Sequence, residues 1–143
     1  MSLHTDLVAI KPSRFEATYS LPEHGPDVLF SSTWNGTEYF ATLDAKPYLI
    51  CAFDRSINLD HIAIAFNHTK YCFTKFSVFV SKDNLGYKVV TENIENRYLT
   101  DKPINVMVRM KDVQYVLFNF LSNSNDSKLF TISQIDFFVR PQY

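Results

Sequence analysis

Apolar and polar residues alternate along most of the chain with the two-residue period of a β-strand. The clearest alternation lies within residues 57–90, where Ile62 and Ile64 fall on one face and Ala63 and Ala65 fall on the other. A period of this kind predicts strands that bury one face against a core.

The strands that we expect are separated by short polar breaks, and no segment has a convincing helical period. In chain order they cover residues 7–10, 14–19, 38–43, 48–53, 57–66, 73–81, 87–91, 104–110, 113–121 and 129–139. Lys111 and Asp112 separate two of them and are predicted to form a hairpin turn. Residues 115–120 are apolar on both faces, as expected of a central strand. Many short strands at even spacing predict an antiparallel sandwich or barrel of about eight to ten strands.

Size and composition fit a single domain that covers residues 1–143. A chain of this length buries roughly two thirds of its unfolded surface, so a core forms without disulfides or metals. Apolar residues make up 46% of the sequence, and the thirteen Phe and eight Tyr favour half-buried strands. Only three Gly are present, so most turns must use Asn, Asp, Ser and Lys.

The charges of the chain are nearly balanced and evenly spread. Fourteen Lys and Arg oppose fifteen Asp and Glu, for a net charge of −1, and no basic stripe recurs along the sequence. General binding to nucleic acid or to an anionic membrane therefore has no electrostatic basis. No apolar run is long enough to span a bilayer. The first residues lack a basic segment followed by an apolar core, so no signal peptide is predicted.

The two cysteines do not suggest a reactive or metal-binding site. Cys51 lies inside an apolar run, where we expect a buried thiol, and Cys72 precedes a predicted strand. The sequence leaves open whether they are joined, because a disulfide requires close Cα atoms. No metalloprotease, nucleophile-elbow, phosphate-loop or dinucleotide motif occurs. His68 and Cys72 flank one loop, but nothing predicts the geometry of a catalytic dyad. We therefore expect a protein that is not an enzyme.

Three segments together resemble a known family. They read DVLFSSTW at residues 27–34, LDHIAIAFNHTKYCFTKFSVFVSKDN at residues 59–84 and KLFTISQIDFFV at residues 128–139. In order and spacing they resemble the galactose-binding-like sandwich of discoidin and coagulation-factor C-type domains. They are most similar to the carbohydrate-binding modules attached to polysaccharide-degrading enzymes such as alginate lyases. The resemblance implies an all-β, antiparallel jelly-roll sandwich, with function in the loops.

The resemblance also implies one structural calcium ion at the early loop. Calcium binds six or more oxygen atoms, and Asp27 and Ser32 match two of the family's positions. Where the family has a Glu before the Ile of the last strand, this chain has Gln134, which can ligate only through its neutral amide oxygen. The family's Gly and Asn are replaced by Val28 and Leu29. The alternative is that Asp27 only caps a turn.

Sugar binding in such modules uses an aromatic ring and neighbouring polar groups in the loops at one end. The best cluster is His68, Lys70 and Tyr71, which lie between two predicted strands. A lysine favours acidic sugars, because charge-assisted hydrogen bonds are stronger than neutral ones. Further candidates in neighbouring loops are Asn35, Asn125 and His24. The alternative is an ordinary solvated loop. Trp34 is expected to pack rather than to bind.

The function predicted from this resemblance is non-catalytic carbohydrate recognition, with a polysaccharide or glycan as ligand and an attached catalytic domain as a further partner. The alternative is a protein–protein adaptor on the same fold, since fold alone does not decide function. The location follows from the function: extracellular for a carbohydrate-binding module and cytoplasmic for an adaptor. A shallow aromatic and polar pocket favours sugar, and a broad exposed apolar patch favours a protein partner.

Overall fold

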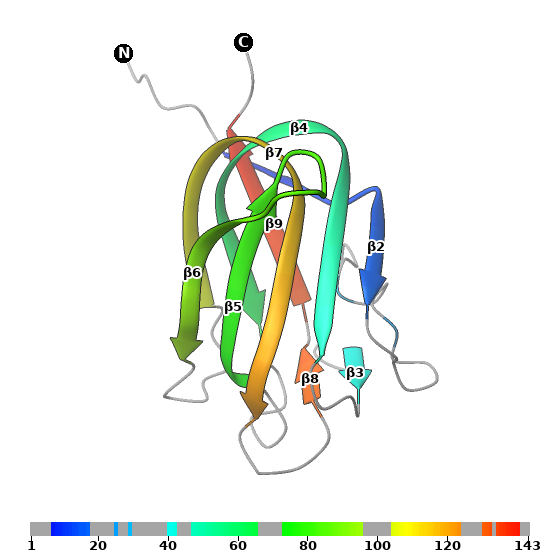
Figure 1. Ribbon diagram of the computed structural model, residues 1–143, viewed down its shortest axis with the longest axis vertical. Coiled ribbons are helices and arrows are strands. Elements are labelled where there is room, and N and C mark those ends of the chain that lie inside the picture. Colours follow the sequence, from blue (N-terminus) through cyan, green and yellow to red (C-terminus); the bar gives the residue numbers. More distant parts are fainter. Residues whose placement is uncertain are drawn as a thin grey trace.

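The computed structural model describes residues 7–17, 25, 29, 40–42, 47–65, 73–95, 104–123, 130–132 and 134–140. These residues form nine strands and no helix long enough to be an element (Figure 1). In chain order the strands are β1 (Val8–Ile10), β2 (Arg14–Ala17), β3 (Phe40–Thr42), β4 (Tyr48–Ala65), β5 (Phe73–Ser81), β6 (Lys88–Glu95), β7 (Ile104–Asn123), β8 (Phe130–Ile132) and β9 (Gln134–Arg140).

Two long strands, β4 and β7, bend together and so take part in both layers of a sandwich (Figure 1). The first half of β4 pairs with β2 and with the second half of β7. That half of β7 pairs with β5, and β5 pairs with β6. The second half of β4 pairs with β9 and with the first half of β7, and β1 pairs with β9. All these pairings are antiparallel. The predicted all-β antiparallel sandwich is confirmed, and β3 and β8 form a separate two-stranded sheet.

The bends have local causes in the backbone. Between Ala52 and Ile57 the register of β4 against β7 shifts, and the Ala52 carbonyl instead accepts hydrogen bonds from the backbone N–H and the Oγ of Ser13, at 2.9 and 3.1 Å. In β7, Arg109 and Asp112 take the left-handed conformation, with φ of 52° and 58°. Irregularities of this kind bend a strand and allow it to pass from one layer to the other.

Two expectations about these segments were wrong. Lys111 and Asp112 form no hairpin, because the chain continues as one strand on both sides of them. Residues 48–53 and 57–66 were likewise expected as separate strands, and the described part forms the single strand β4. Polar residues at a corner give the same sequence pattern as polar residues in a turn, since both positions are exposed.

The core lies between the layers and is rich in phenylalanine. Phe137 of β9 meets Phe53 of β4 edge to face, with ring centroids 5.1 Å apart, and lies 6.3 Å from the ring of Phe118 in β7. All three rings are at most 2% exposed. The alternation predicted from the sequence is confirmed where it is described: Ile62, Ile64, Phe76, Val78, Val80, Ile135, Phe137 and Val139 are all buried in this core.

The sandwich has two ends that matter for function. At the arch end β4 and β7 bend, and the turn between β5 and β6 lies beside them (Figure 1). At the opposite end, named here the Gln134 end, β9 begins at Gln134, which pairs with the last residue of β4, Ala65.

Asp60 ties β9 to β4 near the arch end. Its carboxylate accepts hydrogen bonds from His61 Nδ1 at 2.8 Å and from Arg140 Nε at 3.1 Å, with Arg140 Nη2 also at 3.1 Å. A carboxylate can only accept here, so Nδ1 of His61 carries the hydrogen. The His61 ring also stacks on Phe138, with centroids 4.5 Å apart. A buried acid thus has partners on both strands.

Cys51 is buried, as the sequence predicted, and it is a free thiol. Burial raises the pKa of this thiol well above its ordinary value, because a thiolate is poorly solvated in the core. A neutral, enclosed thiol is unreactive. Cys51 is therefore a core residue, and Cys72 lies outside the described residues.

Candidate functional site

Most of the predicted site residues lie outside the described part of the chain. This applies to the predicted sugar-binding residues His68, Lys70, Tyr71, Asn35, Asn125 and His24, and to the predicted calcium ligands Asp27 and Ser32. Gln134 is the one predicted site residue that the structure describes.

The strand ends that flank the predicted sugar-binding loops nevertheless meet at one end of the sandwich. Ala65, before His68, pairs with Gln134. Phe73, after Tyr71, pairs with Asn123, which precedes Asn125. Figure 1 shows both pairs at the Gln134 end, so strand ends that are far apart in sequence lie at the same end of the sandwich.

Gln134 has an unusual environment for an amide. Its Nε2 donates to both carboxylate oxygens of Asp136, at 3.0 and 3.1 Å. These bonds fix the orientation of the amide, so Oε1 points the other way, where it is buried and accepts no hydrogen bond from the part of the chain that the structure describes. A buried oxygen without a partner is costly, and native proteins rarely leave one. Such an oxygen can ligate a hard cation such as calcium.

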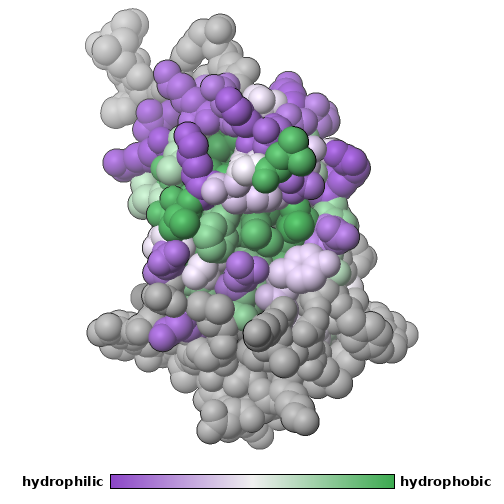
Figure 2. Space-filling view, viewed as in Figure 1, coloured by the Kyte–Doolittle hydropathy of each residue, from purple (hydrophilic) through white to green (hydrophobic). Residues whose placement is uncertain are grey.

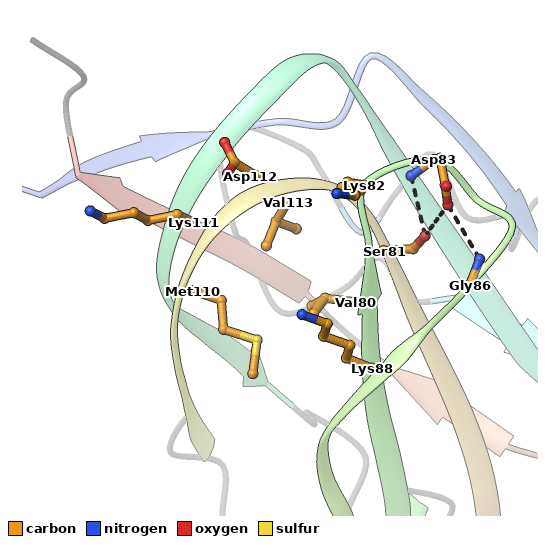
Figure 3. Close-up of a pocket in the computed structure, with 10 residues that line it drawn as sticks. All are labelled: Val80, Ser81, Lys82, Asp83, Gly86, Lys88, Met110, Lys111, Asp112 and Val113. Carbon is orange, nitrogen blue, oxygen red and sulfur yellow. Dashed lines mark hydrogen bonds between the residues drawn. The ribbon is translucent and has the colours of Figure 1, made fainter.

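A second feature, at the arch end, was not predicted from the sequence. A hollow of about 550 Å³ lies between the β5–β6 turn and the bend of β7 (Figure 3). Its floor is apolar and its rim is charged. The lining residues are Val80, Ser81, Lys82, Asp83, Gly86, Lys88, Met110, Lys111, Asp112 and Val113.

One wall of the hollow is a turn with its own hydrogen-bond network. Ser81 Oγ accepts from the backbone N–H of Asn84 at 3.0 Å and donates to Asp83 Oδ1 at 3.1 Å. The same oxygen of Asp83 accepts from the backbone N–H groups of Leu85 and Gly86, at 2.9 and 3.2 Å. These backbone hydrogen bonds lower the pKa of Asp83. The Asp83 carboxylate thus stays ionised, and its Oδ1 already accepts hydrogen bonds from within the turn.

The lysines around the hollow have no such partners. Lys82, Lys88 and Lys111 make no ion pair with another described residue. Figure 3 shows Lys88 extending across the hollow, beside Val80, and Lys111 directed away from it. Among the described residues, all three non-glycine residues with positive φ, namely Asn84, Arg109 and Asp112, lie in the two segments that frame the hollow. Such conformations are frequent at functional sites.

The outer face of the β4–β7–β5–β6 layer carries an apolar row. Pairing aligns Ile50 with Leu117, Leu117 with Phe79, and Phe79 with Val89. Val89 is 48% exposed, and the other three are partly exposed. Figure 2 shows apolar side chains gathered in the middle of this face, below a hydrophilic rim at the arch end. The row is the type of surface that a protein partner covers.

Within the described residues, no group of three His, Cys, Asp or Glu is placed to hold a metal ion. The same residues contain no helix that is long and apolar enough to cross a membrane.

The comparisons with known proteins rest on structure alone, because no protein-family model and no curated protein matches this sequence. The F5/8 type C domain of a Bacteroides fragilis protein superimposes with a TM-score of 0.74 at 12% identity, over 95% of this chain and 98% of that domain. The protein has a discoidin-like fold.

Carbohydrate-binding modules of family 32 share this discoidin-like fold. The module of AlyQ in complex with 4,5-unsaturated mannuronic acid matches with a TM-score of 0.76 at 11% identity, over 91% of this chain and 97% of the module. The module of C. perfringens NanJ in complex with galactose matches with a TM-score of 0.75 at 14% identity, over 93% and 99%. The superpositions establish the jelly-roll sandwich, and at identities this low they establish the fold alone. The predicted resemblance is confirmed at that level.

Proposed function

We propose that the protein is a non-catalytic carbohydrate-binding module that recognises a polysaccharide through the loops at the Gln134 end. The observation that carries the proposal is the discoidin-like fold, shared with sugar-binding modules over nearly the whole chain. Strand pairing adds support, since it brings the flanks of His68, Tyr71 and Asn125 to one end. Lys70 favours an acidic sugar. An associated catalytic domain is the partner that such a module would deliver to its substrate.

The test is binding to a panel of acidic and neutral polysaccharides by affinity electrophoresis, followed by calorimetry with oligosaccharides. We expect Tyr71→Ala to weaken binding by about tenfold, because a stacked aromatic ring contributes roughly 1–1.5 kcal/mol. His68→Ala is expected to weaken it less, through the loss of one hydrogen bond. Phe15→Ala, which removes an exposed aromatic ring from β2, serves as the matched control. Equal losses from Tyr71→Ala and Phe15→Ala would place the sugar elsewhere.

We further propose that the Gln134 end holds one calcium ion, with Gln134 Oε1, Asp27 and Ser32 as ligands. The ion would be structural and would fix the early loop against β9. The support is the buried oxygen of Gln134, which has no hydrogen-bond partner among the described residues. Calcium would supply the missing electrostatic partner for this oxygen.

Gln134→Glu is the variant that tests the calcium site. Without calcium we expect a lower melting temperature than in the parent protein, because a second carboxylate would lie within about 3 Å of Asp136, where Gln134 now donates. Added calcium is expected to raise the melting temperature of the variant by several degrees, and by more than that of the parent, since ligand charge increases calcium affinity. Magnesium at the same concentration is the control. A melting temperature that is unaffected by calcium in both proteins would refute the site.

A protein partner is the second candidate function, and the apolar row Ile50–Leu117–Phe79–Val89 is the observation that favours it. Folded protein that binds no member of the sugar panel would favour this adaptor function. The next experiment would then be a search for proteins whose capture depends on Leu117.

A further inference from the structure

We propose that the hollow at the arch end is a second ligand site, specific for an acidic sugar residue. Lys82 and Lys88 would bind the carboxylate, and the apolar floor formed by Val80, Met110 and Val113 would take the C–H face of the ring. This site is separate from the loops of the proposed function, and it rests on that function only for the choice of a sugar as the anionic ligand.

The charges of the hollow favour an anion. Three lysines and two aspartates line it, and of these Lys111 is directed away from the hollow. Asp83 is engaged by the backbone N–H groups of Leu85 and Gly86, whereas no described residue pairs with the lysines. The ammonium groups thus remain available to a ligand. A smaller hollow of about 130 Å³ shares Met110 and Lys111 and adds Arg109, which extends the positive surface.

The apolar surface that the hollow offers to a ligand comes mainly from Met110. Val80 and Val113 line the hollow but are only 3% and 2% exposed, and Met110 is partly buried beside them. A flexible thioether adapts to the shape of a ligand. The volume of about 550 Å³ falls within the range of small-molecule sites. An apolar floor below cationic groups is complementary to a ring with one hydrophobic face and one carboxylate.

The position of the hollow has a consequence for binding to a polymer. The two ends are separated by the length of β5, nine residues or roughly 30 Å. A short oligosaccharide cannot reach both sites, so each end would hold its own segment of polysaccharide. Two weak sites on one rigid module increase the overall affinity for a polymer through their effective concentration.

The experiment is a titration of the ¹⁵N-labelled protein, followed by amide chemical shifts. The probes are a mannuronate trisaccharide and the matching mannose trisaccharide, which differ in their carboxylates, at constant ionic strength. We expect the acidic sugar, but not the neutral one, to shift the amides of residues 81–88 and 109–113. The Lys82→Ala/Lys88→Ala double variant is expected to weaken these shifts by about tenfold.

Two further variants keep the outcome interpretable. Lys82→Arg/Lys88→Arg retains the charge and is expected to retain binding. Lys11→Ala removes an exposed lysine that lines neither hollow and is expected to change nothing. Equal shifts from the neutral sugar, from sodium sulfate, or in the double alanine variant would overturn the proposal. Shifts confined to the loops at the Gln134 end would overturn it while supporting the proposed function. Shifts confined to the arch end would support this second site and contradict the proposed function.

Discussion

Replacing Phe137 with alanine is expected to lower the free energy of unfolding by about 3–5 kcal/mol, the largest effect of any substitution considered. The Phe137 ring is fully buried and contacts Phe53 and Phe118, which belong to the opposite layer. Its removal leaves a cavity where the two layers meet, and the surrounding strands cannot close it without losing their pairing. Urea unfolding followed by far-ultraviolet circular dichroism measures the change.

Phe138→Ala is the matched control, because it removes the same side chain from the next position of the same strand. Phe138 lies on the other face of β9, where it is half-buried and stacks on His61. We expect a loss of about 1–2 kcal/mol. A loss as large as that of Phe137→Ala would show that the core does not lie where the structure places it.

Asp60→Asn is expected to have the second largest effect and to lower the free energy of unfolding by about 2 kcal/mol. Asp60 has a side chain only 7% exposed and accepts hydrogen bonds from His61 and Arg140. Removing one partner of a fully buried ion pair lowers stability by more than this, because the other charge is left buried. Here the Arg140 side chain is 57% exposed, so its charge stays solvated after the substitution. Asp54→Ala, at an exposed position of the same strand, is expected to change the free energy by less than about 0.5 kcal/mol.

The same carboxylate makes stability depend on pH. The hydrogen bond from His61, assisted by the hydrogen bond and charge of Arg140, lowers the pKa of Asp60, although burial opposes the shift. The unfolded chain therefore takes up the proton first, at a pH of about 4. Stability from this group is complete above that pH and is lost as the pH falls through the lowered folded pKa. The free energy difference between the parent and Asp60→Asn should therefore shrink on acidification. A difference that is constant from pH 6 to pH 2 would contradict this account.

Much of the fold could be predicted from the sequence because strand periodicity is a local property. The alternation in residues 73–81 and 134–139 identified the buried residues Phe76, Val78 and Phe137 before any neighbour was known. The order and spacing of three sequence segments resemble those of discoidin domains, and this resemblance predicted the jelly-roll sandwich. Whether the predicted loop residues bind sugar stays a prediction, since the described residues establish only where the flanking strand ends lie.

Long-range arrangement was the part that the sequence could not supply. Lys82, Lys88 and Met110 come from a turn, an edge strand and a bend, and no spacing in the sequence signals that they line one hollow. The continuity of β7 through Lys111 and Asp112 was also missed, because a corner and a hairpin turn both require polar, exposed residues. The chain by itself determined which residues form strands and which face each strand buries, since side chains alternate whatever their partners are. Only the tertiary structure decided which strands bend between layers and which side chains meet at each end, because those contacts join residues far apart along the chain and depend on the register of pairing.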